Sequence, residues 1–499
     1  MITLDGAQAG RALGSQALAE PVTGVSIDSR SLQKGDLFVA IRGEKFDGHD
    51  FVQAAFDAGA CGAVVQKADW RGRAGVDIGR VYPVKDTVKA LGSLAREVRR
   101  ASSATVYGIT GSVGKTSTKD LLKAALGRVS QVVATKANQN NEVGLPLTLL
   151  SIESDTEAVV AEMGMRGLGQ IAELATIAEP DVGVITNIHP VHLELLGTLE
   201  NVAQAKAELV GGVRKGGVAV VPAACEVLEP LLHGCDCRLV RYAATETESG
   251  AGITGAEVTG WLESDSHRGG QILRLRWPDE EIRVAVSHLP KHTLENAVAA
   301  LAACYASGLP IDECARGVAE AEASEGRGRI IELGPLCVID DTYNANPAAV
   351  RAAVDDLVQR AKRRGGRAVA VIGDMLELGP ESSRFHEEVG VYAAEAGVSL
   401  LWGVGPRTEA TVGGFTHWCE VHQAVGEEWG AGHAESSADA EGLLPLLEAG
   451  DVVLFKASRG VRLENMIRKV VDEASAGRWG ERRTSAGTGA TEHKEKRRC

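Results

Sequence analysis

The stretch ASSATVYGITGSVGKTST, residues 101–118, decides how the central part of this chain folds. The β-branched run from Thr105 to Ile109 predicts a strand, and the glycine-containing loop after it leads into Lys115 and Thr116. A strand that ends in such a loop and opens a helix can bind phosphate, because backbone N–H groups and the positive helix end face the anion. In this pattern the lysine reaches the β- and γ-phosphates and the threonine hydroxyl binds Mg²⁺. We interpret the stretch as a nucleotide site.

The loop departs from the full eight-residue phosphate-loop pattern. Ile109 stands where the first glycine should be, so only GxxGK[ST] remains. The alternative interpretation is a tight strand–helix turn of small residues that binds no ligand. If the loop binds a nucleotide, the contacts come from Gly111, Ser112, Val113, Gly114, Lys115, Thr116 and Ser117.

Length and composition limit the classes of protein to which the chain can belong. Its 499 residues exceed what one core supports, and the net charge of −14 argues against a general nucleic-acid-binding surface. No stretch approaches the roughly 18 apolar residues of a membrane span, and the N-terminus lacks the parts of an export signal. The nine cysteines show no zinc-binding spacing. We therefore expect a cytoplasmic, monomeric enzyme with reduced thiols.

Strand-like and helix-like runs alternate from Thr105 onward, which predicts parallel βαβ units. Alternating polar and apolar residues within 250–287 predict antiparallel strands at the edge of this sheet, and 99–103 reads as a linker before it. The predicted fold class is α/β with three domains: a small N-terminal α/β domain, a central P-loop domain with a doubly wound, mostly parallel sheet, and a C-terminal Rossmann-like α/β domain. The predicted boundaries are 1–100, 101–325 and 326–475, followed by a disordered tail over 476–499.

Polar side chains follow two apolar runs of the central domain. Glu162 ends AVVAE and His192 follows VGVITNI, and the carboxyl ends of parallel strands meet at the edge where ligands bind. A carboxylate and an imidazole near phosphates can hold a divalent ion, although a loop histidine bonded to backbone is the alternative for His192. Lys206 lies in a helical stretch and by itself indicates only a solvated lysine.

A loop rich in side-chain amides, TKANQNNEVGLP, spans residues 135–146. Its amides offer many donors and acceptors, and they favour turns over helix. Asn138, Asn140 and Asn141 can therefore bind a polar substrate, or they can form a well-capped turn.

Over roughly residues 20–470 these motifs resemble the muramyl ligase family, the ATP-dependent ligases of peptidoglycan precursors. GITGSVGKTSTK resembles the phosphate loop of that family, including its displaced first glycine. The resemblance implies ATP and two Mg²⁺ ions, one held by Thr116 and Glu162 and the other by His192 and Lys206. It also implies that Lys206 is carbamylated, which makes it an anionic metal ligand, and that Lys115, His192 and Lys206 are catalytic.

Further matches imply where the nucleotide and the substrate bind. His292 and Asn296 match the family's helix near the adenine, Arg327 matches its hinge arginine, and Asp341 and Asn344 match the nucleotide-facing start of its third domain. The segment 28–51 resembles the family's UDP-sugar-binding domain. We expect Arg459 to contact the substrate; the alternative is that it forms a salt bridge on the surface. The expected substrate contacts are Ser29, Arg30, Asp47, His49, Asn138, Asn140, Asn141 and Arg459.

Two segments, DDTYNANPAAV (340–350) and GDMLELGPESSRFHEEVG (373–390), resemble the family member that joins UDP-N-acetylmuramoyl-tripeptide to D-alanyl-D-alanine. The amide-rich loop fits that member's TxGNxNNxxGxP, with Ala137 in place of a glycine. The DNPR-type motif of the member that acts one step earlier is absent from the last third of the chain. That earlier step and a nucleotide switch without ligation are the alternatives.

Overall fold

The structure is a computed structural model that describes residues 1–67, 70, 77–191, 193–245, 247–248, 250, 255–264, 270–286, 289, 291–422 and 429–479. The chain divides into two compact units, Met1–Glu322 and Ala323–Cys499. No helix in the described residues is both long enough and apolar enough to span a bilayer.

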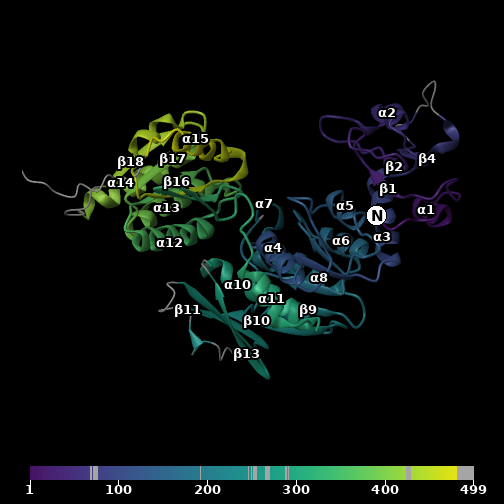
Figure 1. Cartoon of the computed structure of the whole chain (residues 1–499), viewed down its shortest axis with the longest axis horizontal. Coiled ribbons are helices and arrows are strands. Elements are labelled where there is room, and N and C mark those ends of the chain that lie inside the picture. Colours follow the sequence, from purple (N-terminus) through teal and green to yellow (C-terminus); the bar gives the residue numbers. More distant parts are fainter. Residues whose placement is uncertain are drawn as a thin grey trace, which may run out of the picture. The chain divides into compact units, whose positions relative to one another are not determined.

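The first unit contains two sheets (Figure 1). Its strands are β1 (Gly24–Ser26), β2 (Asp36–Val39), β3 (Gly62–Gln66), β4 (Val81–Val84), β5 (Thr105–Thr110), β6 (Val132–Ala134), β7 (Ala158–Glu162), β8 (Val182–Ile185), β9 (Val218–Pro222), β10 (Arg238–Ala244), β11 (Val258–Ser264), β12 (Gln271–Trp277) and β13 (Glu280–Val286). Its α-helices are α1 (Gly6–Leu13), α2 (Val52–Asp57), α3 (Thr87–Ala101), α4 (Lys115–Leu126), α5 (Gly144–Leu149), α6 (Gln170–Ala178), α7 (Leu193–Leu196), α8 (Leu199–Gly211), α9 (Glu229–Leu232), α10 (Lys291–Ala306) and α11 (Ile311–Ala319).

The order of strands in the larger sheet confirms the predicted doubly wound architecture. Nine strands lie in the order β13-β12-β11-β10-β9-β8-β5-β7-β6, and pairing is parallel from β11 to β6. Strands β12 and β13 pair antiparallel at the edge, as the alternating pattern predicts. The smaller sheet has the order β1-β2-β3-β4 and is wholly parallel.

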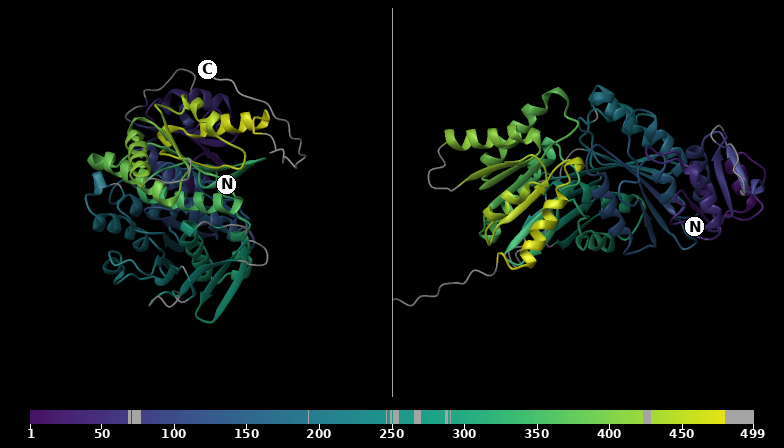
Figure 2. Two further views of the ribbon diagram at one scale, coloured as in Figure 1. Left: turned by 90° about the vertical axis from the view of Figure 1, so that its left-hand side faces the viewer. Right: turned by 90° about the horizontal axis from the view of Figure 1, so that it is seen from above.

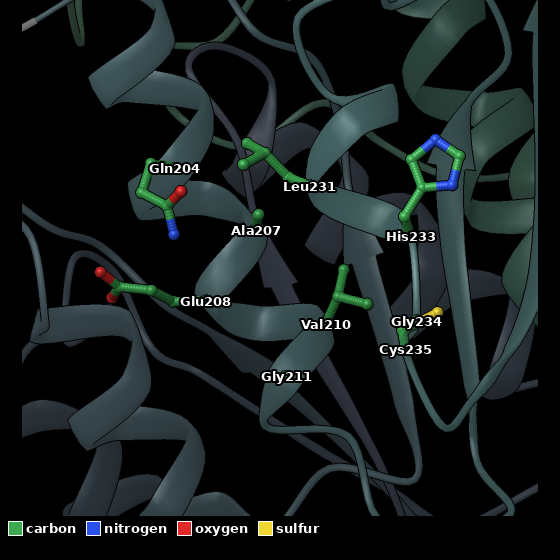
Figure 3. A pocket seen from close by; sticks show the side chains of 9 residues that line it. All are labelled: Gln204, Ala207, Glu208, Val210, Gly211, Leu231, His233, Gly234 and Cys235. Atoms are coloured by element: carbon green, nitrogen blue, oxygen red, sulfur yellow. The ribbon is translucent and has the colours of Figure 1, made fainter.

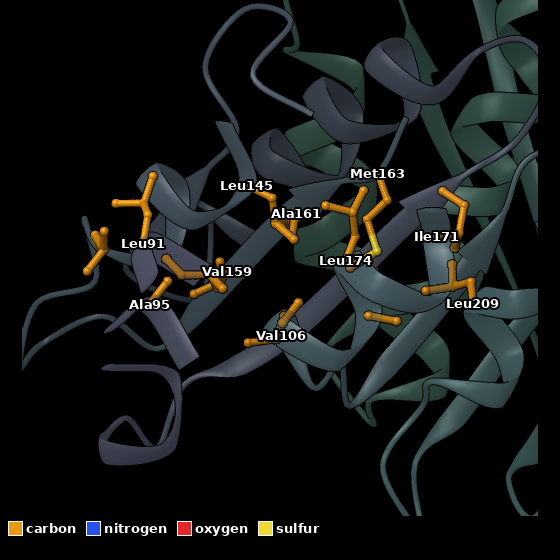
Figure 4. Close-up of a cluster of buried hydrophobic side chains, with 14 of the residues drawn as sticks. Leu91, Ala95, Val106, Leu145, Val159, Ala161, Met163, Ile171, Leu174 and Leu209 are labelled. Carbon is orange, nitrogen blue, oxygen red and sulfur yellow. The ribbon is translucent and has the colours of Figure 1, made fainter. Parts of the chain in front are cut away.

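Helices cover both faces of the nine-stranded sheet because successive strand residues point to opposite sides (Figure 2). Val106 and Val159 pack with α3, α5, α6 and α8, in the core that Figure 4 shows. Tyr107 and Val160 pack on the other face with α4, α10 and α11. Strands buried on both faces explain the nearly continuous apolar runs of β5 and β7 in the sequence.

Helix α3 ties the N-terminal sheet to the central one. Its start is capped by Asp86, which accepts hydrogen bonds from Val88 N and Lys89 N. Near its end the buried Arg99 donates to the carbonyl oxygens of Ala178, Glu179 and Ala104 and to the Asp181 carboxylate. The predicted linker over 99–103 is therefore wrong: its first residues form the last turn of α3, held by buried hydrogen bonds.

The second unit is a six-stranded α/β sheet in the order β14-β15-β19-β16-β17-β18, antiparallel only at β14. This mostly parallel sheet confirms the Rossmann-like prediction. Its strands are β14 (Arg329–Leu333), β15 (Leu336–Asp341), β16 (Ala368–Gly373), β17 (Leu400–Val404), β18 (Gly430–Ala434) and β19 (Val452–Lys456). Its α-helices are α12 (Pro347–Arg364), α13 (Ser382–Ala396), α14 (Glu409–Val421) and α15 (Glu464–Ser475).

The folded part of the second unit extends past the predicted boundary at residue 475. Trp479 is 8% exposed, packs in the core with α15 and donates from its indole Nε1 to the Leu447 carbonyl oxygen. Residues 476–479 therefore belong to the folded unit rather than to a tail. The rest of the predicted tail, 480–499, lies outside the described residues.

Candidate active site

The phosphate loop lies between β5 and α4, as the sequence predicts. Two neighbours make its glycines necessary. A Cβ on Gly111 would meet the Thr186 hydroxyl, and a Cβ on Gly114 would meet the Asn296 amide; both glycines have positive φ, 152° and 81°. The missing first glycine has a structural reason, because Ile109 is a buried residue inside β5.

The loop ends in groups suited to an anion. The backbone N–H groups of Gly114, Thr116 and Ser117, at the start of α4, donate to no described group, as expected for the first turn of a helix. The Lys115 ammonium donates to the carbonyl oxygens of Gly111 and Ser112, at 2.8 and 3.2 Å. The lysine thus lies over the loop that would hold the phosphates.

Glu162 lies beside the loop because β7 pairs with β5, with Glu162 opposite Ile109. The Thr116 hydroxyl donates to Glu162 Oε2 at 2.8 Å, and Asn140 Nδ2 donates to Oε1 at 2.7 Å. The carboxylate belongs to a residue that is only 2% exposed. The Thr116 hydroxyl oxygen and Glu162 Oε2 are 2.8 Å apart, a separation typical of neighbouring ligand atoms around Mg²⁺, whose bonds to oxygen are about 2.0–2.1 Å long. The pair therefore fits the predicted metal.

Lys206 is not the solvated lysine that its sequence pattern alone indicates. It lies on α8, is 1% exposed, and its ammonium has no hydrogen bond or ion pair with any described residue. Burial lowers its pKa well below the usual range, and the charge of Lys115 lowers it further. Lys206 is therefore within electrostatic reach of the phosphate loop and tends to be a neutral amine.

The segment after β8 borders the loop from the other side, because β8 also pairs with β5. Burial lowers the pKa of His189 in this segment. His192, the predicted catalytic residue and metal ligand, lies outside the described residues.

The three asparagines of the amide-rich loop have different surroundings. Asn140 holds Glu162, whereas Asn141 Oδ1 accepts from Gly144 N at 2.9 Å and caps α5. Asn138 is exposed. Ala137, which replaces the family's glycine, keeps a left-handed backbone with φ of 48°. The loop therefore keeps the conformation that a glycine would favour, at a cost in strain.

Asn296 of α10 closes the loop on its helix side. It is buried and accepts from the Thr118 hydroxyl at 3.3 Å, next to Gly114. The side chain of His292, on the same helix, lies outside the described residues.

The predicted substrate residues of the N-terminal domain take part in two local hydrogen-bonded pairs, Arg30 with Asp28 and His49 with Asp47. Ser29 lies between Asp28 and Arg30 in the sequence. Arg30 donates to the Asp28 carboxylate, and this hydrogen bond lowers the pKa of Asp28 to about 2. Partial burial acts to raise the pKa of Asp47, but hydrogen bonds with His49 and Arg42 bring it down to about 2.

Both ring nitrogens of His49 are engaged within the domain. Gln66 N donates to Nε2 at 2.8 Å, so Nδ1 carries the proton and donates to Asp47 Oδ1 at 2.6 Å. The structure gives His49 a structural role, and its contact with a substrate stays a prediction.

In the second unit, Asp341 and Asn344 lie at the carboxyl end of β15 and are joined by Lys456 of β19. The Lys456 ammonium donates to Asp341 Oδ2 at 2.6 Å and to the Asn344 carbonyl oxygen at 3.0 Å. Arg327 and Arg459 both lie over the ring of Tyr343, with guanidinium carbons 3.8 and 5.2 Å from its centroid.

Some site residues were missed by sequence reasoning. Lys456 ends the buried run DVVLFK, the same signal that singles out Glu162. The sequence around Thr135 carries no such signal. Its hydroxyl nevertheless accepts a hydrogen bond from Glu162 N at 2.9 Å and fixes the backbone of Glu162. Thr186 and Asn187 directly follow β8, in a segment where the sequence pattern indicates only His192.

A pocket of about 300 Å³ lies between α8 and the segment 231–235 (Figure 3). Residues 204, 207, 208 and 211 of α8 line it and share one helix face, which leaves Lys206 on another face. None of the predicted site residues lines this pocket, so it is separate from the phosphate loop. Its lining is Gln204, Ala207, Glu208, Val210, Gly211, Leu231, His233, Gly234 and Cys235.

The fold and the loop define a P-loop nucleotide-binding enzyme of the α/β class, in which a buried carboxylate reaches the loop threonine. Three family models match successive parts of the chain: "Mur ligase family, catalytic domain" over 21–99, "Mur ligase middle domain" over 109–304 and "Mur ligase, glutamate ligase domain" over 326–459. The chain belongs to the Mur ligase family.

Similar proteins cover nearly the whole chain. The UDP-N-acetylmuramoyl-tripeptide--D-alanyl-D-alanine ligases of Bacillus subtilis and Escherichia coli are each 32% identical, over 90% of this chain and 93% and 94% of their own. The MurF ligase of Thermotoga maritima, solved in complex with ADP, is 30% identical with a TM-score of 0.75, over 91% of this chain and 98% of its own. A MurF structure from Acinetobacter baumannii has a TM-score of 0.80 at 27% identity, over 94% and 99%.

Proposed function

We propose that this chain joins the terminal carboxylate of UDP-N-acetylmuramoyl-tripeptide to the amine of D-alanyl-D-alanine, with conversion of ATP to ADP and phosphate. The observation that carries the proposal is the Thr116–Glu162 pair at a phosphate loop, within a chain that aligns over 90% of its length with ligases named for this reaction. A structure named for the preceding step, the addition of 2,6-diaminopimelate, has a TM-score of only 0.52 at 17% identity. This difference favours the D-alanyl-D-alanine step.

The chemistry explains why ATP is needed. A carboxylate is a poor acyl donor because its leaving group would be oxide, whereas an acyl phosphate expels phosphate. Transfer of the γ-phosphoryl group to the carboxylate, attack by the amine and loss of phosphate give the amide. Because several anions must approach one another, the main requirement is neutralisation of charge. The Lys115 ammonium and the backbone N–H groups of Gly114, Thr116 and Ser117, which face no described acceptor, are placed to provide it.

The Thr116 hydroxyl and the Glu162 carboxylate are the groups that we propose hold one Mg²⁺. When bound there, the ion would neutralise charge on the β- and γ-phosphates. Asn140 fixes one carboxylate oxygen and Thr135 fixes the backbone of Glu162. These contacts keep the carboxylate aimed at the loop before any ligand arrives.

Lys206 is the group that we propose is carbamylated. A neutral amine can attack CO₂, forming an N–C bond and releasing a proton to solvent, and burial of Lys206 supplies the neutral amine. The resulting carboxylate would serve, with His192, as ligand to a second Mg²⁺. We expect Lys206→Ala to be inactive and to be partly rescued by formate. Full activity of the wild type in a bicarbonate-free buffer would argue against the carbamate.

The remaining substrate assignments belong to the same proposal. Arg459 is exposed and has no carboxylate partner in the described residues, which leaves its guanidinium available for a substrate carboxylate. The expected cytoplasmic location follows from the need for ATP and a UDP-linked substrate. Both the monomeric state and the domain boundaries stay predictions.

An acceptor screen tests the proposed function. The protein is incubated with ATP, Mg²⁺ and either UDP-muramoyl-tripeptide or UDP-muramoyl-dipeptide, with D-alanyl-D-alanine or single amino acids as acceptors. We expect release of phosphate, and a product with the mass of the pentapeptide precursor, only with tripeptide and D-alanyl-D-alanine together. A product from the dipeptide would assign the preceding step, and phosphate release that ignores every acceptor would indicate a nucleotide switch.

A further inference from the structure

The segment that follows β8 is hydrogen-bonded to the phosphate loop. Ser112 N donates to the Asn187 carbonyl oxygen at 3.0 Å, and Val113 N donates to Asn187 Oδ1 at 2.9 Å. The Thr186 hydroxyl donates to the Val113 carbonyl oxygen at 2.6 Å. Both polar backbone groups of Val113, at the tip of the loop, are therefore held by one neighbouring segment. We call Thr186, Asn187 and His189 the loop brace.

The hydroxyl of Ser112 is also engaged by the loop brace. It donates to the His189 carbonyl oxygen and accepts from His189 N, both at 2.9 Å. A hydroxyl has one proton to donate, so this side chain has no donor left for a phosphate.

The loop brace is itself held by a tyrosine of strand β10. The Tyr242 hydroxyl of β10 is buried and bonds to the backbone carbonyl oxygens of Ile185 and Thr186. Asn187 is 8% exposed, and removal of its side chain would leave the Val113 N–H without its acceptor. The tip of the loop is thus held by hydrogen bonds from a segment that is itself anchored to β10.

These bonds divide the donors of the loop into two groups. The N–H groups of Ser112 and Val113 are committed to the loop brace, whereas those of Gly114, Thr116 and Ser117 face no described acceptor. Among the described residues, the backbone donors without a described acceptor are therefore those of Gly114, Thr116 and Ser117, at the start of α4.

We propose that Asn187 is a positioning residue for nucleotide binding, which holds the tip of the phosphate loop in its phosphate-binding shape before the nucleotide arrives. The inference rests on the assignment of the ATP site. A loop that is already ordered loses little conformational entropy on binding, which is the general basis of preorganised affinity. The loop shape serves ADP and ATP alike, so loss of Asn187 weakens both by the same factor.

Nucleotide binding and hydrogen exchange test the role of Asn187. Affinities of the full-length protein for ADP and for a non-hydrolysable ATP analogue, both with Mg²⁺, are measured by titration calorimetry. We expect Asn187→Ala to weaken both about fivefold, which equals about 1 kcal/mol, the net worth of one hydrogen bond. Without nucleotide, the peptide covering residues 108–118 should exchange faster than in the wild type.

A conservative variant and a matched control separate positioning from general destabilisation. Asn187→Asp keeps a side-chain oxygen for the Val113 N–H, so protection of residues 108–118 from exchange should return. Thr148→Val removes a different buried side-chain hydrogen bond, the one that the Thr148 hydroxyl donates to the Gly144 carbonyl oxygen at the start of α5, and should leave nucleotide affinity unchanged.

Three outcomes would overturn the inference. The first is wild-type ADP affinity with unchanged exchange in Asn187→Ala. The second is a loss confined to the ATP analogue, which would make Asn187 a contact of the γ-phosphate. The third is an equal loss in Thr148→Val. Failure of the wild-type protein to bind ADP at all would instead contradict the assigned nucleotide site.

Discussion

Replacement of Lys206 by methionine should stabilise the protein while it abolishes ligation. The Lys206 amine is buried, has no partner among the described residues and lies within reach of the Lys115 charge, so folding must either bury a charge or release a proton. Methionine has a similar length and fills the same space without either cost. The prediction applies to protein freed of Mg²⁺ and bicarbonate.

The size of the effect follows from proton linkage. A lysine in an unfolded chain has a pKa of about 10.4, and burial lowers the pKa of Lys206 well below that value, so folding near neutral pH has a cost at this residue. Replacement of a buried charged group by an apolar one of similar volume stabilises proteins by about 1–4 kcal/mol, and we expect a gain in that range. Because the folded-state pKa is lowered, the unfolded state binds more protons below pH 10.4 and the wild type becomes more stable as the pH rises. The advantage of Lys206→Met should therefore shrink as the pH approaches about 10.4.

Urea unfolding at pH 7 and pH 9.5 measures this difference, with pulsed hydrogen exchange of peptides from α8 to assign the transition to the first unit. Lys215→Met is the matched control, since Lys215 is exposed and its replacement should change stability by less than about 0.5 kcal/mol. If Lys206→Met were no more stable than the wild type at pH 7, or if its advantage did not depend on pH, the neutral amine and the carbamate argument built on it would be refuted.

Three further predictions concern the loop, the metal site and the second unit. Ala137→Gly should raise stability by about 0.5–1 kcal/mol in thermal denaturation, because glycine accepts a φ of 48° without strain; a lower melting temperature would contradict the left-handed backbone. Glu162→Gln keeps the shape but not the charge of the proposed metal ligand, so the Mg²⁺ concentration for half-maximal activity should rise at least about tenfold; an unchanged Mg²⁺ titration would remove Glu162 from the proposed site. Lys456→Met leaves Asp341 without its 2.6 Å partner and should cost about 3 kcal/mol in urea unfolding, part of which Asp341→Asn should restore in the double variant; purely additive effects would show that the pair is not coupled.

Apolar runs followed by a single polar residue predict the fold well, and they predict that Glu162 lies beside the phosphate loop. The position of Glu162 could be predicted because β7 is a buried parallel strand, and the last residue of such a strand lies at the edge of the sheet where ligands bind. Lys456 is likewise the last residue of a buried parallel strand, β19, so the same pattern also indicates this lysine as a site residue. The periodic patterns also predicted the antiparallel edge strands β12 and β13.

The roles of individual polar residues could not be predicted from sequence, because they depend on partners distant in the chain. Asn140 and Asn141 are neighbours of the same type, yet one holds Glu162 and the other caps α5. The sequence around His49 does not show that its Nε2 accepts a hydrogen bond from Gln66 N at the end of β3. Lys206 reads as solvated because the elements that bury it are contributed by other parts of the chain.

The buried guanidinium of Arg99 limits where this protein can be divided. A fragment of the central domain that began at the predicted boundary of residue 101 would lack Arg99 and leave the carbonyl oxygens of Ala104, Ala178 and Glu179 without their donor. Such a fragment would also expose the apolar face of α5 and α6 that α3 covers. A central domain prepared for ligand screening should therefore start no later than the Asp86 cap of α3, even though that helix belongs by sequence to the domain before it.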